Sequence, residues 1–120
     1  MKTWAVVGLG SNPVRAAFGV AKLLQDKGHR IIPVYPRAET VHGEVGYKTL
    51  SEIPGPVDVV DCFVNSTLVG KVVDEAIAIG AKAVWMQLDV IDNDAIARAQ
   101  AAGLITVMDR CPAIEYRKKS

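Results

Sequence analysis

Apolar residues gather along the chain in five short runs that predict buried β-strands. Each run is bounded by glycine or polar residues, which is typical of strands rather than of long helices. Between most of the runs lie stretches in which apolar residues recur three and four positions apart, as on one face of an α-helix. The expected strands cover residues 4–7, 30–34, 57–64, 83–87 and 104–108.

Three helices are expected between these strands, and each ends at a glycine that leads into the next strand. Glycine is favoured just after a helix because it adopts positive φ without strain. The first helix is expected to start with Asn12 as its N-cap and Pro13 in its first turn, and to run to about Lys27. The expected buried stripes are Ala17, Val20, Ala21 and Leu24 in the first helix and Val69, Val72, Ala76 and Ile79 in the second, and Asp92 is the expected cap of the third.

The alternation of strands and helices predicts an α/β fold. Strands that are nearly continuous in Val and Ile are buried on both faces, which is typical of a parallel sheet covered by helices on both sides. We therefore expect a single Rossmann-like domain over residues 1–120, a three-layer αβα sandwich. Its doubly wound, five-stranded sheet is expected to have the order 3-2-1-4-5. Residues 35–56 show no sustained period and predict a long loop with one short turn near residues 50–53.

Charge and composition exclude some classes of partner. The chain has 120 residues, half of them apolar, and a net charge of +1, which argues against a general electrostatic grip on nucleic acid. No apolar run approaches the ~18 residues that a membrane span needs. Two cysteines without metal-ligand spacing predict free thiols, no metal site and a cytoplasmic location. The expected assembly is a monomer or a homodimer.

The stretch VVGLGSNPVR ends the first strand in a glycine-rich turn and carries the clearest candidate chemistry. Glycines let the backbone approach a ligand closely, and the amino end of the following helix favours an anion. The pattern GxGxxP differs from the dinucleotide fingerprint GxGxxG, and a plain strand-to-helix turn is the alternative. The candidate phosphate-binding residues are Gly8, Gly10, Ser11, Asn12, Pro13 and Arg15.

The end of the second strand reads VYPRAET and does not suit NAD, because Pro36 and Arg37 stand where an acidic residue would bind the ribose. Arg37 suits a phosphorylated ribose, as in NADP or coenzyme A, and a solvated surface arginine is the alternative.

Cys62, His42 and Asp89 are all expected near the same end of the sheet. A cysteine beside a histidine that a carboxylate orients can act as a nucleophile. The alternatives are a buried strand cysteine, a surface histidine and an aspartate that caps a turn. Asp61 lies inside the strand VDVVDCFV and needs a polar partner, so a structural role is favoured for it.

The whole chain resembles the small CoA-binding domain proteins, stand-alone relatives of the CoA-binding domain of succinyl-CoA synthetase. The matching stretches are VVGLGSNPVRAAFGVAKLL, GHRIIPVYP, VDVVDCF, VDEAIAIGAKAVWMQL and AGLITVMDRCPAIEY. The resemblance implies a domain that binds coenzyme A and has no chemistry of its own. It implies that the pyrophosphate lies on residues 8–15, the adenosine end near Pro36 and Arg37, and the pantetheine near Phe63 and Leu88.

Several residues depart from the family's pattern, and they cluster on the expected cleft. Val64 stands where arginine is frequent, Asp89 where glycine is usual, and Cys62 where an aliphatic residue is usual. The first two changes move the cleft away from anions and predict weaker binding of phosphates. The clustering supports a second hypothesis, in which the cleft was repurposed or engineered and Cys62 and His42 hydrolyse an activated ester. Whether the chain is an enzyme therefore depends on which hypothesis holds.

Overall fold

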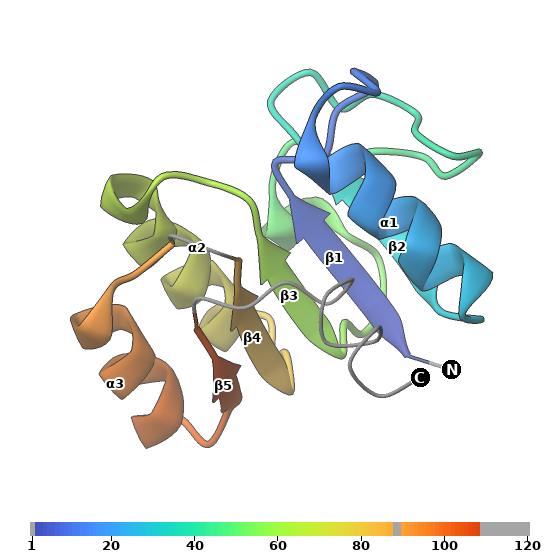
Figure 1. The fold of residues 1–120 in the computed structure, drawn as a ribbon. Helices are drawn as coiled ribbons and strands as arrows, with labels where there is room; N and C mark the ends of the chain where they lie inside the picture. Colours follow the sequence, from blue (N-terminus) through green and yellow to red (C-terminus); the bar gives the residue numbers. More distant parts are fainter. Residues whose placement is uncertain (1, 88–89, 109–120) are drawn as a thin grey trace.

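The computed structural model describes residues 2–87 and 90–108, which form a parallel five-stranded sheet with helices on both faces (Figure 1). This confirms the expected Rossmann-like three-layer α/β fold. The strands are β1 (Thr3–Val7), β2 (Arg30–Val34), β3 (Val59–Cys62), β4 (Ala83–Met86) and β5 (Ile105–Val107). The helices are α1 (Ala16–Asp26), α2 (Ser66–Ala78), α3 (Asn93–Ala101) and the short 3₁₀ helix η1 (Leu50–Glu52).

Two apolar cores form, one on each face of the sheet. Side chains alternate between the two faces along each strand, so neighbouring strand residues enter different cores. The α1-side core joins α1 to alternate residues of the strands, among them Trp4, Val6 and Ile31. The α2-side core joins α2, α3 and η1 to the other set, among them Ala5 and Val7.

The first helix begins later than expected. Its N-cap is Arg15, which has an extended backbone and no side-chain capping bond, so the prediction of Asn12 as N-cap and Pro13 in the first turn is wrong. The Asn12 side chain instead accepts a hydrogen bond from the Val14 amide at 3.0 Å. This local turn competes with the helix for the backbone, which is the usual behaviour of asparagine. The turn between β1 and α1 is therefore longer than a minimal strand-to-helix turn.

Most of the other helix signals are confirmed. Ala17, Val20, Ala21 and Leu24 are the buried residues of α1, and Asp92 caps α3 by accepting from the Ala95 amide at 3.0 Å. The stripe of α2 differs, because Val73 is fully buried, whereas Val72 and Ile79 are only partly buried. Val72 is partly buried, because it packs against the edge of the core and also lines a cleft at the carboxyl edge of the sheet.

The strand order is 2-1-3-4-5, so the expected order 3-2-1-4-5 is wrong. The strand at Val59–Cys62 pairs with β1 on the side away from β2. The place beside β2 is held by a single residue, Tyr47, whose amide donates to the Pro33 carbonyl at 3.0 Å and whose carbonyl accepts from the Tyr35 amide at 2.9 Å. The connection from β2 contains no α-helix. Its buried residues Leu50 and Val57 belong to the α2-side core and carry the chain back past β1.

The corrected order moves the crevice of the sheet. In an open parallel sheet, ligands bind where two neighbouring strands lead to helices on opposite faces. Here those strands are β1, which leads to α1, and β3, which leads to α2. The residues that face the glycine turn therefore come mainly from the start of α2 rather than from the end of β4.

The outer strands are less buried than expected. Ala83 and Trp85 on one face of β4 are half-buried, and Ile105 of β5 is 69% exposed. These residues lie on the α1 side, because Trp85 packs against Trp4 with ring centroids 5.7 Å apart. The α1 helix lies over β1 and β2 and does not extend over this part of the sheet (Figure 1).

We expect Gly19→Ala to raise the free energy of unfolding by about 0.5–1 kcal/mol, because alanine is the better helix former. Gly19 is an exposed residue of α1, and a Cβ built there meets no atom within 4 Å. Urea denaturation measures the change. Gly8→Ala is the contrasting variant and should destabilise the fold, since its Cβ would lie 2.3 Å from the Phe63 carbonyl oxygen. A Gly19→Ala variant less stable than the parent would contradict the helix assignment.

Candidate functional site

A wide cleft lies at the carboxyl edge of the sheet, between the amino ends of α1 and α2. Its volume is about 630 Å³, within the ~300–1,000 Å³ range of small-molecule sites. One wall is the glycine turn with the start of α1, and the opposite wall is the end of β3 with the first three turns of α2. The end of β2 and residues 48–50 complete the lining. The lining residues are Val7, Gly8, Arg15, Ala16, Ala17, Val34, Tyr35, Pro36, Lys48, Thr49, Leu50, Phe63, Val64, Asn65, Leu68, Lys71, Val72, Glu75, Gln87 and Val90.

Gly8 is the tightest point of this edge. Its φ is +99°, and its amide donates to the Val34 carbonyl at 2.8 Å. The Phe63 amide in turn donates to the Val7 carbonyl at 2.8 Å, so the backbones after β1 and β3 touch. No residue with a side chain fits here, because both the positive φ and the contact with Phe63 require glycine.

A smaller cavity of about 200 Å³ adjoins the cleft and shares Gly8, Arg15 and Tyr35 with it. It opens over the glycine turn itself. Its lining includes a hydrogen-bonded pair in which Ser11 donates from its amide and its hydroxyl to the two carboxylate oxygens of Glu39. These bonds hold the pKa of Glu39 below its usual range, with a further contribution from the nearby Arg37 cation. The remaining lining residues are Gly10, Asn12, Arg37 and Glu39.

The structure gathers most of the expected phosphate-site residues around these two cavities. The main cleft contains the expected residues Gly8, Arg15, Pro36 and Phe63, and the smaller cavity contains Gly8, Gly10, Ser11, Asn12, Arg15 and Arg37. Pro13 lines neither cavity. Leu88 and Asp89 lie outside the described residues.

Two lysines of the cleft were missed by the sequence analysis. Lys48 comes from the loop before η1, and Lys71 from the second turn of α2. No local sequence pattern marks these two lysines as cleft residues. They could have been found only from the observed strand order, which brings the start of α2 opposite the glycine turn. With Arg15 and Arg37, four cations line the two cavities against the two carboxylates Glu39 and Glu75. The described lining therefore favours anions, with Val64 as an uncharged member of the wall.

Asp61 and Gln87 form a buried polar pair, and Gln87 lines the cleft. Asp61 is fully buried and Gln87 is 4% exposed, and the Gln87 amide nitrogen donates to one Asp61 carboxylate oxygen at 2.5 Å. Within the described part of the chain, the other carboxylate oxygen has no hydrogen-bond partner. Burial raises the pKa of Asp61 to about 7, and the bond from Gln87 opposes part of that rise. The expectation that Asp61 needs a partner is met by Gln87, which also reaches the cleft.

Cys62 is sealed in the α2-side core. Its exposed fraction is 0%, and burial, together with the nearby Asp61 charge, raises the pKa of its thiol. Thiolate is the reactive form of cysteine, so this environment suppresses its reactivity. The alternative expectation, a small buried strand residue, describes Cys62.

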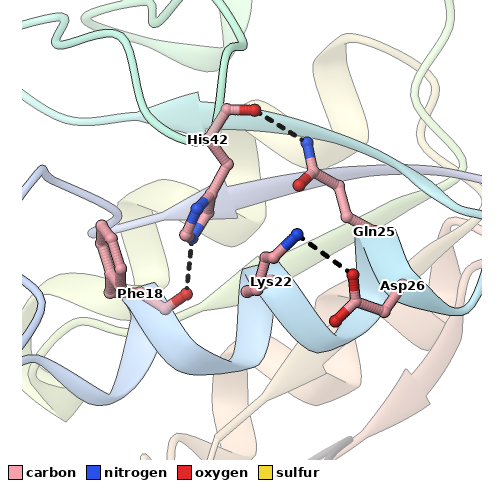
Figure 2. A network of polar contacts seen from close by, with 5 residues as sticks. All are labelled: Phe18, Lys22, Gln25, Asp26 and His42. Atoms are coloured by element: carbon pink, nitrogen blue, oxygen red, sulfur yellow. Dashed lines mark hydrogen bonds and ion pairs between the residues drawn. The ribbon is translucent and has the colours of Figure 1, made fainter.

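His42 lies on the opposite side of the sheet from Cys62. Its ring packs on Phe18 of α1 with centroids 4.2 Å apart, and its Nε2 lies 2.8 Å from the Phe18 carbonyl oxygen (Figure 2). A carbonyl only accepts, so Nε2 carries the proton and is not free to act as a base. The structure does not bring Cys62 and His42 together, and the dyad that the second hypothesis requires is not formed.

No group of three or more His, Cys, Asp or Glu side chains in residues 2–87 and 90–108 is arranged to hold a metal ion. In the same residues, no helix has the length and apolar character of a membrane span.

Residues 2–117 match a family model described as a CoA binding domain. The chain is 34% identical to the uncharacterized protein YneT of Bacillus subtilis over 110 residues, which are 92% of this chain and 82% of that protein. It is 35% identical over 81 residues to the acetate–CoA ligase (ADP-forming) II subunit alpha of Pyrococcus furiosus, covering 67% of this chain and 18% of that subunit. A solved structure of a hypothetical protein from Pyrococcus horikoshii OT3 covers 98% of this chain, with 82% of its own length matched, at 38% identity and a TM-score of 0.93.

We expect stability to fall as the pH rises from about 4 to about 7. Asp61 in the unfolded chain loses its proton near 3.8, whereas the folded protein keeps it until about 7. Over that window the folded state binds more protons, so raising the pH costs roughly 2–4 kcal/mol of unfolding free energy. Urea denaturation between pH 4.5 and 8 measures this fall. Asp61→Asn should remove it, and Asp94→Asn, an exposed control, should keep it. An unchanged slope in Asp61→Asn would contradict the assignment.

We expect the Cys62 thiol to resist alkylation in the folded protein. Iodoacetamide at pH 8 should modify it at least about a hundredfold more slowly than in denaturant, because the reaction needs an exposed thiolate. Mass spectrometry of the Cys62 peptide separates this thiol from Cys111. Equal rates in native and denaturing buffer would show that Cys62 is accessible and would reopen a chemical role for it.

Proposed function

Since the chain belongs to the CoA-binding domain family, we propose that the cleft between α1 and α2 binds coenzyme A and that the protein acts as a binding domain. Coenzyme A has an adenosine 3′-phosphate, a pyrophosphate and a long, mostly uncharged pantetheine arm. A site for it needs an anion-binding turn with an apolar channel leading away from it. The cleft offers both.

The observation that carries the proposal is the glycine turn at the crevice between β1 and β3. Gly8 brings the backbone against Phe63 with no side chain in between, and the amino ends of two helices meet at this edge. Helix amino ends carry free N–H groups and a positive partial charge, which favour phosphate. The Ser11 amide and hydroxyl already hold a carboxylate, which supports the capacity of this turn to bind an anion.

The charged and apolar residues of the two cavities match the three parts of coenzyme A in this proposal. Arg15 borders both cavities and suits the pyrophosphate, and Arg37 in the smaller cavity suits a phosphate on the ribose. Val64, Leu68, Val72 and Val90 give the main cleft an apolar wall for the pantetheine arm. In this proposal the arm passes Phe63, as the family resemblance implies.

The second hypothesis, ester hydrolysis by Cys62 and His42, receives no support from the geometry. The thiol is buried in one core and the histidine ring packs on the far side of the sheet. The geometry therefore favours ligand binding over hydrolysis.

We expect the protein to bind coenzyme A in calorimetric titration, and Arg15→Gln to weaken that binding about tenfold. The loss corresponds to one charge-assisted hydrogen bond to phosphate. Arg30→Gln is the matched control, because Arg30 is an exposed arginine at the other end of the sheet and lines neither cavity. Dephospho-CoA and NADP serve as comparison ligands, and weaker binding of dephospho-CoA would support the role of Arg37. No binding at millimolar coenzyme A would overturn the proposal.

A further inference from the structure

The glycine turn has an anion of its own. Ser11 is the residue of this turn whose amide and hydroxyl both point at one acceptor group, the Glu39 carboxylate. The carboxylate lies in the smaller cavity above Gly10, where a Cβ on Gly10 would approach one of its oxygens to 3.0 Å. Glu39 thus takes the space and the donors that a bound phosphate would need.

Glu39 belongs to a segment, residues 36–46, that we call the strap. The strap crosses from the end of β2 over the start of α1 and is fastened at its middle, away from Glu39. Val41 is 2% exposed in the α1-side core, and His42 is held by its ring bond to the Phe18 carbonyl. The Gln25 side chain also donates to the His42 carbonyl at 3.0 Å, so two residues of α1 grip the strap (Figure 2).

The backbone of the strap adopts strained φ angles at two residues. Ala38 and His42 both have positive φ, at 50° and 53°, a conformation that residues with a side chain rarely adopt. Gly46 is required because a Cβ there would lie 2.1 Å from the Glu39 carbonyl oxygen. The fold therefore holds the Glu39 backbone beside the glycine turn whether or not its side chain is bonded to Ser11.

We propose that Glu39 is an internal competitor for the ligand's phosphate and sets the affinity of the glycine turn. A carboxylate and a phosphate carry the same sign of charge and need the same Ser11 donors, so one must leave when the other binds. The inference rests on the proposed function for the identity of the ligand. It assigns to Glu39 a role opposite to that of the acidic residue that binds ribose in dinucleotide sites.

Displacement of Glu39 needs only a rotation of its side chain. The anchors at Val41 and His42 do not involve the carboxylate, so the strap stays in place when the Ser11 bonds break. Arg37 lines the same small cavity as Glu39, and its charge contributes to the lowered pKa of that carboxyl. The competitor therefore weakens binding without blocking it.

The test compares Glu39→Gln with Glu44→Gln in calorimetric titrations with coenzyme A. Both variants remove one negative charge from the same strap, but Glu44 lines neither cavity. Glu39→Gln should bind about fivefold more tightly than the parent, a size typical of an exposed charge interaction. Glu44→Gln should stay within about twofold of the parent. Unchanged or weaker binding by Glu39→Gln would overturn the proposal, and weaker binding would instead indicate that Glu39 contacts the ligand.

A second measurement separates this inference from the identity of the ligand. Inorganic pyrophosphate is titrated into the parent and Glu39→Gln while the Ser11 amide is followed by NMR. The inference requires tighter pyrophosphate binding by Glu39→Gln even if coenzyme A itself fails to bind, a result that would overturn only the proposed function. In the parent, the pKa of Glu39 should rise when pyrophosphate or coenzyme A is added, because the carboxylate loses the Ser11 bonds and gains a negative neighbour. A Glu39 pKa that does not move with saturating ligand would contradict displacement.

Discussion

The contact between Gly8 and Phe63 is the constraint on which the cleft depends. The chain must turn from β1 to α1 while β3 passes close beside it, and the Gly8 Cα has the Phe63 carbonyl in the position of a side chain. The turn therefore presents bare backbone at the crevice, with α1 leaving on one face and α2 on the other. A larger residue would push β3 away from β1 and separate the two walls that Arg15 and Lys71 line.

The near-neutral charge of the chain conceals a local surplus of positive charge. The sequence holds 14 basic and 13 acidic residues, yet basic side chains outnumber acidic ones around the described cavities. Many of the acids are engaged elsewhere, as in the ion pairs of Asp26 with Lys22 and of Asp74 with Arg98. Exposed pairs of this kind add little to stability. Their effect here is to balance charge away from the cleft, so net charge alone is a poor guide to the charge of the cleft lining.

The sequence predicted the elements well and their spatial neighbours less well. Apolar period and terminal glycines identify every strand and the buried stripe of α1, because these signals are local. The order of the strands depends on where a 24-residue connection leads, and nothing in the pattern of residues 35–58 records that Tyr47 takes the place beside β2. The positions of Lys48 and Lys71 in the cleft were missed for the same reason, because they depend on the course of this connection. The N-cap of α1 was missed for a different reason, since Asn12 satisfies a local turn just as well as a helix end.

The alternation of side chains along β3 bears on whether Cys62 and His42 could form a catalytic dyad. Adjacent residues of a strand point to opposite faces, so Asp61 and Cys62 cannot both face the same core. Asp61 pairs in register with Val6 and Trp85 of the α1-side core, which leaves Cys62 to the α2-side core. His42 reaches the sheet only through α1, on the Asp61 side. A dyad between Cys62 and His42 would require a one-residue shift of β3, which would expel Asp61 from its bond with Gln87 and turn Val60 out of the α2-side core. The pairing of β3 therefore both shapes one wall of the cleft and keeps Cys62 apart from His42.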